Sequence, residues 1–294
     1  MNRTPSILEL LQYIIIITFL ILSNQSSNEK LLDKNSEYYN FLKRISIYNT
    51  VTKIFVTKKN IEFQEQFGFL LENNEYFYIF NNNIIYAYFF KEKNSDEHII
   101  YFNGITNITD LKIVIELIHD ILNNNFNNEK IKSLLNNVGN LYKINSNSIE
   151  LNNNNFNIFD LFEYLYKNIY FVENKNKIRL KINGFSLGGP ISQIFAKILT
   201  DEYINLDIQM YNIESWFGGN KELYKELNDK IKIFNIYNKN SSFYFFNKYF
   251  QKYFKTNLII KKKDEEIKNY MEYIFPIGVI KYISDNHLLS KFLE

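Results

Sequence analysis

The sequence contains no cysteine, only three histidines, and a formal net charge of just +2 over 294 residues. Without cysteine, the chain can form no disulfide bond, no thiolate nucleophile and no cysteine-based metal site. A metal site built from histidines is equally unexpected with so few of them. Acidic and basic residues are interspersed rather than gathered into a basic stripe, which argues against nucleic acid as a partner.

The sequence has little proline and glycine, three and nine residues respectively, but 46% of it is hydrophobic. No linker rich in Pro, Gly or Ser and no internal repeat interrupts the chain after residue 28. We therefore expect residues 28–294 to form a single domain with ample material for a buried core.

The amino-terminal segment, residues 1–27, has the layout of a targeting signal. Arg3 precedes an apolar run at residues 13–22, and small polar residues follow at 23–27. A short basic region, about ten apolar residues and a small polar region is typical of a signal peptide. The apolar run is short for a membrane-spanning helix, which needs about 20 apolar residues. The sequence thus predicts a secreted protein, with an uncleaved membrane anchor as the main alternative and a buried helix as a further one.

The first part of the domain is expected to contribute mainly strands. Short segments rich in β-branched and aromatic residues are bounded by Asn clusters, which is the pattern of strands separated by turns. Residues 81–83 are three consecutive asparagines and predict a hairpin turn. The predicted strands cover residues 51–56, 76–80, 84–90 and 98–102, and residues 36–46 are predicted to be helical.

Strands and helices alternate in the second part of the domain. Such alternation favours a parallel sheet with crossover helices. The Asn-rich segment 123–155 before it is expected to be an irregular surface excursion, and residues 158–171 a helix. The alternating elements are a strand at 178–182, a helix at 190–199, a strand at 206–213, a helix at 221–227 and a strand at 231–237.

The segment that carries chemistry is Gly-x-Ser-x-Gly, with Ser186 between Gly184 and Gly188. It directly follows one predicted strand and precedes a predicted helix, the context of a nucleophile elbow. A nucleophilic serine must lie on a tight turn, and flanking glycines leave room where a Cβ would collide. The amides at the start of the following helix can stabilise an oxyanion. Pro190 fits the first turn of this helix, because the N–H that proline lacks would have no partner within the helix there.

Three further segments accompany this elbow in a fixed order. Residues 99–111 read I-I-Y-F-N-G-I-T-N-I-T-D-L, residues 212–220 read N-I-E-S-W-F-G-G-N, and His287 lies near the carboxyl terminus. With the elbow G-F-S-L-G-G at residues 184–189, they resemble the class 3 lipases, the fungal-type triacylglycerol lipases of the α/β-hydrolase superfamily. The corresponding family motifs are F-R-G-T with a following D-W, T-F-G-S-P-R-V-G-N, a catalytic His and the elbow G-H-S-L-G-G. The resemblance covers roughly residues 50–294.

This resemblance implies an α/β-hydrolase fold, with a mostly parallel central sheet and helices on both faces. It implies a serine ester hydrolase that acts on lipid esters at a lipid–water interface and needs no cofactor. Ser186 is then the nucleophile and His287 its base, and the amides of Leu187 and Ile105 bind the oxyanion. An amphipathic helix from Asp110 occupies the position of the lipase lid, although it can equally pack its apolar face on the sheet.

The acid of the Ser-His-acid triad is the largest departure from the family. The family has an Asp after the strand that here corresponds to residues 231–237, but this chain has no carboxylate there. Glu214, at the end of the preceding strand, is one candidate for the acid. Asn238 or Asn240 as a neutral substitute is another, and a more distant acid such as Asp229 is a third.

The missing acid favours one rival interpretation, a catalytically inactive lipase-fold protein that binds a lipid or a partner. A further alternative is an integral membrane protein anchored by residues 7–22 whose remaining domain is idle. His98 and His119 are expected to be structural or exposed, because one precedes a predicted strand and the other lies in the amphipathic helix.

Overall fold

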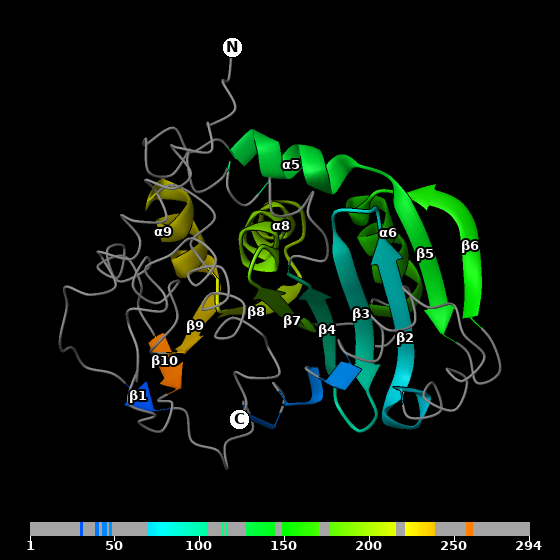
Figure 1. Cartoon of the computed structure of the whole chain (residues 1–294), viewed down its shortest axis with the longest axis horizontal. Coiled ribbons are helices and arrows are strands. Elements are labelled where there is room, and N and C mark those ends of the chain that lie inside the picture. Colours follow the sequence, from blue (N-terminus) through cyan, green and yellow to red (C-terminus); the bar gives the residue numbers. More distant parts are fainter. Residues whose placement is uncertain are drawn as a thin grey trace, which may run out of the picture.

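The computed structural model describes residues 30–31, 39–40, 43–45, 47–48, 70–104, 113, 116, 128–144, 149–170, 177–215, 221–238 and 257–260. Figure 1 shows their arrangement. The strands are β1 (Lys30–Leu31), β2 (Asn74–Asn81), β3 (Tyr86–Glu92), β4 (Glu97–Phe102), β5 (Gly139–Ile144), β6 (Ile149–Phe156), β7 (Ile178–Phe185), β8 (Leu206–Ile213), β9 (Lys232–Asn238) and β10 (Asn257–Ile260). The helices are α5 (Asn128–Asn136), α6 (Ile158–Leu165), the π-helix η2 (Tyr166–Tyr170), α8 (Gly188–Glu202) and α9 (Lys221–Lys230).

The described strands form one mixed sheet in the order β1-β10-β9-β8-β7-β4-β3-β2-β5-β6. Neighbours pair in parallel from β1 to β4 and antiparallel from β4 to β6. The prediction of a mostly parallel sheet is therefore wrong. Alternation with crossover helices holds only from β7 onward, whereas β2, β3 and β4 are joined by short turns that permit only antiparallel pairing.

The hairpin between β2 and β3 is confirmed. The side-chain oxygen of Asn82 accepts hydrogen bonds from the amides of Ile84 and Ile85, and Asn83 adopts a left-handed φ of 69°. Asparagine tolerates this conformation and bonds its own turn, which explains why three asparagines make the connection. The strand predicted at residues 51–56 lies outside the described residues.

The segment 123–155 is not the irregular excursion expected from its composition. It contains α5, β5 and β6, and these two strands extend the antiparallel side of the sheet by pairing with β2 and with each other. Asparagine has a low strand propensity, so the pattern of β6, which includes four consecutive asparagines, does not indicate a strand. Its pairing with β5 supplies what the local sequence lacks.

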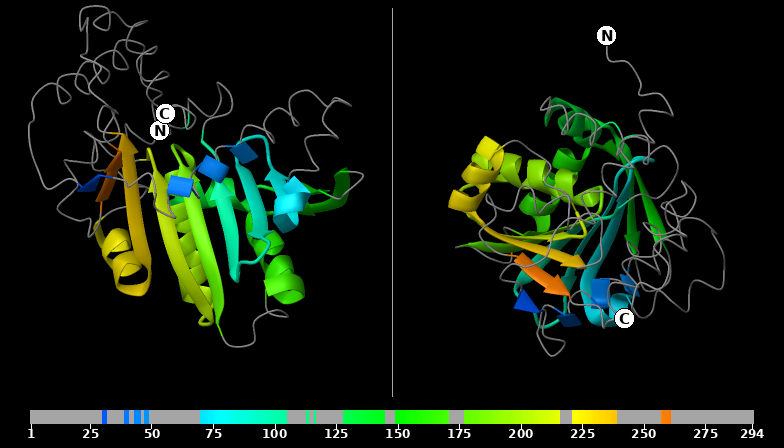
Figure 2. Two further views of the ribbon diagram at one scale, coloured as in Figure 1. Left: turned by 90° about the horizontal axis from the view of Figure 1, so that it is seen from below. Right: turned by 60° about the vertical axis from the view of Figure 1, so that its left-hand side comes forward.

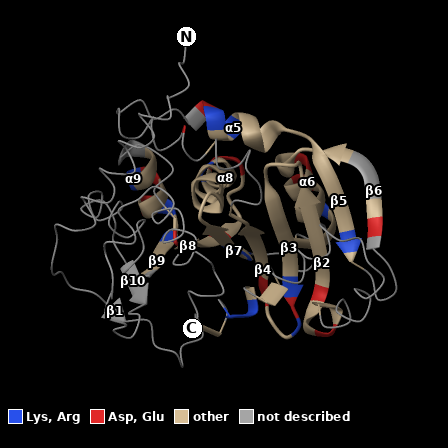
Figure 3. Ribbon diagram, viewed as in Figure 1, with Lys and Arg blue, Asp and Glu red and all other residues tan. Residues whose placement is uncertain are grey.

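The described α-helices gather on one face of the sheet, as Figure 2 shows. Buried residues of α5, α6, α8 and α9 form one hydrophobic cluster with alternate residues of the strands. The opposite face forms a second cluster, in which Ile45 of the predicted amino-terminal helix and Tyr48, a helical residue just beyond its predicted end, pack with strand residues such as Phe77. Helical residues thus contact both faces of the sheet, but the four labelled α-helices all lie on one of them. Both signs of charge occur on α5 and on α9 (Figure 3).

Only Ile113 and Glu116 are described in the helix expected from Asp110, and both are helical. Ile113 is buried in the cluster that includes α5 and α8, and Glu116 forms an ion pair with Lys130 of α5. These contacts favour the packing interpretation for this part of the helix. Of the helices in the described ranges, none is long and apolar enough to cross a membrane, and residues 1–27 lie outside those ranges.

The parallel half of the sheet determines where a site can form. Because β4, β7, β8 and β9 run in parallel, their carboxyl ends meet at one edge. Gly104 lies just beyond the end of β4, Ser186 follows β7, Glu214 follows β8, and Asn238 ends β9. Sites in sheets of this kind form outside the carboxyl ends of the strands.

Candidate active site at the carboxyl edge of the sheet

Ser186 lies in the turn between β7 and α8, as the Gly-x-Ser-x-Gly motif predicts. Its φ is 53°, in the left-handed region that residues with a Cβ rarely adopt. Its amide donates to the carbonyl of Ile213 (3.1 Å), and its own carbonyl accepts from the amide of Gly189 (3.0 Å). The side chain is 1% exposed. The surrounding hydrogen bonds thus maintain a strained turn, a feature that clusters at active sites.

Glycines allow the elbow to pack against the end of β4. A Cβ on Gly188 would lie 2.2 Å from the carbonyl oxygen of Phe102, and one on Gly104 would lie 2.9 Å from Cβ of Ser186. A Cβ on Gly184 would lie 2.4 Å from the carbonyl oxygen of Gly188. Real Cβ atoms essentially never lie within 3.0 Å of another heavy atom in this way, so a side chain at any of the three positions would force a shift at the elbow.

The Leu187 amide is suitably placed for one oxyanion donor. Leu187 is the cap residue of α8, where the first amides have no partner within the helix. Among the described residues, no backbone carbonyl accepts a hydrogen bond from this amide. The partial positive charge of the helix start adds to the attraction for an anion. Ile105, the other expected donor, lies outside the described residues, although Gly104 just before it approaches Ser186 closely.

Glu214 follows β8 in the same way as Ser186 follows β7. Its φ is 46°, its side chain is 0% exposed, and its amide donates to the carbonyl of Ile236 (2.8 Å). Because Phe185 pairs with Ile213, the residues that follow them, Ser186 and Glu214, are neighbours at the edge. A buried carboxyl group is therefore held beside the serine elbow.

Tyr237 of β9 lies close enough to Glu214 for its charge to act on the phenol, and Tyr224 of α9 lies close to Tyr237. Burial raises the pKa of Tyr237 well above its usual value, and Tyr224 and then the Glu214 carboxylate raise it further. Burial also raises the pKa of Tyr224 to about 12, against a hydrogen bond from Asn235 that lowers it. Both phenols therefore stay protonated at any physiological pH.

A chain of buried amides continues from Tyr224. The side-chain amide of Asn212 donates to Oδ1 of Asn235 (2.9 Å), and Nδ2 of Asn235 donates to the Tyr224 hydroxyl (3.3 Å). All three residues are 1% exposed. Buried polar groups are costly unless they are hydrogen-bonded, so this network of β8, β9 and α9 needs each of its members. The sequence offered no signal for it.

The other predicted site residues are described in part or not at all. Asn238 is the last residue of β9 and pairs with Ile260 of β10. His287 and Asn240 lie outside the described residues, so their distances from Ser186 stay predictions. The structure brings together Ser186, Leu187 and Glu214 of the predicted set.

His98 is a core residue, as expected, whereas His119 lies outside the described residues. His98 is 1% exposed, its Nδ1 lies 2.8 Å from the hydroxyl of Tyr76, and its ring centroid is 4.3 Å from that of Tyr170. Burial lowers the pKa of His98 to about 4, and the positive charge of Lys91 lowers it as well. This histidine is neutral in the folded protein at neutral pH.

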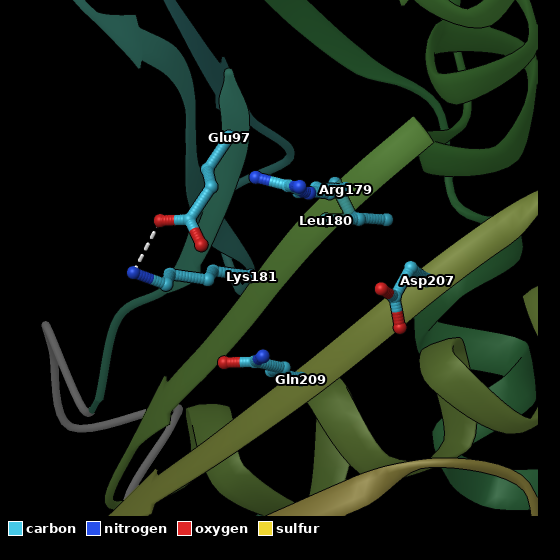
Figure 4. Close-up of a pocket in the computed structure, with 6 residues that line it drawn as sticks. All are labelled: Glu97, Arg179, Leu180, Lys181, Asp207 and Gln209. Atoms are coloured by element: carbon cyan, nitrogen blue, oxygen red, sulfur yellow. Dashed lines mark ion pairs between the residues drawn. The ribbon is translucent and has the colours of Figure 1, made fainter. Parts of the chain in front are cut away.

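A polar pocket of about 260 Å³ lies toward the amino ends of β4, β7 and β8 (Figure 4). Lys181 and Glu97 form an ion pair in it. Arg179, also in its wall, precedes Ser186 by seven residues along β7, which corresponds to roughly 20 Å at about 3.3 Å per residue. The pocket is therefore separate from the candidate active site. Its lining residues are Glu97, Arg179, Leu180, Lys181, Asp207 and Gln209.

No family model and no curated protein matches the sequence. Among solved structures, the chain is similar to a lipase from Rhizopus microsporus var. chinensis, with 10% identity, a TM-score of 0.37, and coverage of 74% of this chain and 76% of that one. Lipase II from Rhizopus niveus gives 10% identity, a TM-score of 0.37, and coverage of 73% and 77%. Alpha/beta hydrolase domain-containing protein 10 from mouse gives 11% identity, a TM-score of 0.25, and coverage of 70% of this chain and 96% of that one.

Proposed function

We propose that this chain is a serine hydrolase of the α/β-hydrolase fold that cleaves lipid esters. The observation that carries the proposal is the left-handed backbone of Ser186 in the turn between β7 and α8. This turn directs a serine to the carboxyl edge of a parallel sheet, beside the Leu187 amide at the start of a helix. A structural serine needs neither the strain nor the glycines that accommodate it.

In the proposed reaction, Oγ of Ser186 attacks the ester carbonyl while His287 accepts its proton. The amides of Leu187 and Ile105 bind the oxyanion of the tetrahedral intermediate. As the intermediate collapses, His287 returns the proton to the departing alcohol and an acyl-enzyme remains. Water, activated by His287, then releases the acid and restores Ser186. No cofactor takes part.

Glu214 is the proposed acid that orients His287 and stabilises its charged form. Support comes from its position directly beside the elbow and from its complete burial, which strengthens the attraction between a carboxylate and an imidazolium. Asn238 lies one strand further from Ser186 and carries no charge. Glu214 is therefore preferred to the neutral substitutes.

The lipid-ester class of substrate rests on the resemblance to class 3 lipases and on the expected signal or anchor at residues 1–27. The burial of Ser186 adds support, since a substrate can reach the hydroxyl only after the site is uncovered. Active sites that close and open around a substrate are common in enzymes, and we propose that a lipid surface opens this one. We accordingly propose secretion or membrane anchoring, with the lipid–water interface as the place of action.

The deciding experiment is hydrolysis of a chromogenic short-chain ester, together with labelling by a serine-directed phosphonate. The full-length protein should hydrolyse the ester and take up one phosphonate per chain, and Ser186→Ala should abolish both. Ser192→Ala is the matched control, because Ser192 is equally buried in α8 and its hydroxyl donates to the carbonyl of Gly189 (2.7 Å). Activity retained in Ser186→Ala refutes the mechanism. A folded wild-type protein with neither activity nor labelling points instead to an inactive lipase-fold binding module.

A further inference from the structure

The side chain of Ser215 fills the space beside the first turn of α8. A Cβ built on Gly189, the second residue of this helix, would lie 1.6 Å from Oγ and 2.4 Å from Cβ of Ser215. The next nearest atom, at 3.8 Å, is Cα of the same serine. Ser215 is 0% exposed and Gly189 is buried, so the two residues pack against each other in the interior.

Gly189 differs from the other glycines of the elbow in what surrounds it. The atoms nearest to a Cβ on Gly184 or Gly188 are backbone atoms, which no substitution of a neighbour removes. At Gly189 the obstructing atoms are those of a side chain. Rotation about the Cα–Cβ bond of Ser215 would move its Oγ but not its Cβ. A side chain at residue 189 would therefore push α8 away from the end of β8, unless residue 215 became smaller.

The end of β8 therefore holds the serine turn at two points. The carbonyl of Ile213 accepts the amide of Ser186 (3.1 Å), and Ser215, two residues further along the chain, packs against Gly189. The amide of Gly189 donates to the carbonyl of Ser186 (3.0 Å), which closes the turn between these points. Leu187 lies within this turn, so the position of its amide relative to Ser186 depends on both contacts.

We propose that Ser215 is a positioning residue, whose side chain sets the first turn of α8, and with it the Leu187 amide, against the Ser186 elbow. The proposal rests on the proposed function, in which this amide binds the oxyanion. Removal of one oxyanion donor costs about 10²–10³ in kcat, and a displacement of about 1 Å costs about 10². A small buried side chain that acts through Gly189 thus controls the geometry of the reaction, although it has no part in the chemistry itself.

The first test is ester hydrolysis by full-length Gly189→Ala, Ser215→Gly and the double variant, with rates divided by the fraction of folded protein from circular dichroism. In Gly189→Ala the Leu187 amide is displaced, so kcat should fall about 100-fold while KM changes less than about threefold. In the double variant the new methyl group occupies the space that the serine side chain has left. Its kcat should recover to within about tenfold of the wild type, which two independent losses would not allow.

The matched control is Gly189→Ala combined with Ser192→Ala. Ser192 is also 0% exposed and its hydroxyl donates to the carbonyl of Gly189 (2.7 Å), but the atoms nearest to a Cβ on Gly189 are all those of Ser215. This combination should keep the low kcat of Gly189→Ala. Recovery with Ser192→Ala overturns the role of Ser215, as does a Ser215→Gly combination without recovery or a Gly189→Ala variant with wild-type kcat. If Gly189→Ala does not fold, the Ser215→Gly combination must restore both folding and activity, or the proposal fails.

The second test needs no activity. Urea unfolding of the same variants gives a double-mutant cycle in the free energy of unfolding. If the two residues pack as described, the double variant is less destabilised than the sum of the single variants, and additive losses overturn the contact itself. Coupled stability without recovery of kcat in an active enzyme shows a contact that is only structural, and overturns the positioning role. A folded wild type without esterase activity overturns the proposed function and the positioning role with it, whatever the stabilities show.

Discussion

Ser186 and Glu214 occupy equivalent positions one residue beyond neighbouring parallel strands, and both have a left-handed backbone. Their φ angles are 53° and 46°, and the amide of Ser186 is bonded to the carbonyl of Ile213, the residue before Glu214. Each such residue costs about 1–3 kcal/mol and persists only where the surroundings impose it. Hydrogen bonds at this edge of the sheet thus hold two neighbouring residues in a costly backbone conformation.

Glu214→Gln should decrease kcat for ester hydrolysis by about 10³ to 10⁴, because His287 loses its charged partner while the shape of the side chain is kept. The measurement is kcat per titrated active site at pH 7. If an asparagine takes the acid's place instead, Glu214→Gln changes little. In that case Asn238→Asp or Asn240→Asp raises kcat by orders of magnitude, and this result would exclude Glu214 as the acid.

Gly188→Ala should destabilise the fold by about 1–3 kcal/mol, the range for overpacking a close contact. The new Cβ would lie 2.2 Å from the carbonyl oxygen of Phe102, and backbone cannot move aside as a flexible side chain can. Urea unfolding followed by circular dichroism gives the free energy. Thr200→Ala, at a half-buried position of the same helix, is the control. Equal stability of the two variants contradicts the tight contact between β4 and the elbow.

The folded protein should lose stability as the pH falls from about 6.5 to about 4, because of His98. The unfolded chain binds a proton at His98 near its ordinary pKa of 6.5, whereas burial lowers the folded pKa to about 4. Protonation therefore favours the unfolded state within this window, by about 3 kcal/mol at its acid end. Urea midpoints at pH 7 and 4.5 measure the effect. His98→Leu should show a distinctly smaller decrease, and an equal decrease would remove His98 as the cause.

Mature protein from the native host should begin near residues 24–28, since the basic, apolar and small polar regions of residues 1–27 are the layout of a cleaved signal. Amino-terminal sequencing is the direct measurement. An intact amino terminus on detergent-extracted protein identifies the anchor instead. Met1 on a protein that is soluble without detergent refutes both.

Local sequence patterns determined several parts of this protein by themselves. The three asparagines at 81–83 determined the β2–β3 turn, because asparagine adopts the left-handed conformation and bonds its own backbone. The elbow at Ser186 was also readable, since glycines and proline at defined positions are needed to pass from strand to helix. Alternation of strand and helix from residue 178 to 237 correctly predicted the parallel pairing of β7, β8 and β9.

Tertiary structure alone decided the rest. The Asn-rich β6 becomes a strand only by pairing with β5, and the sheet is mixed because its first strands are joined by short turns, a property of connections rather than of composition. The neighbourhood of Ser186, Glu214 and Tyr237 likewise depends on the register of three parallel strands. The register of two strands brings together residues that are far apart in the chain. The local pattern of one strand does not encode which residue of the other strand each of its residues will face.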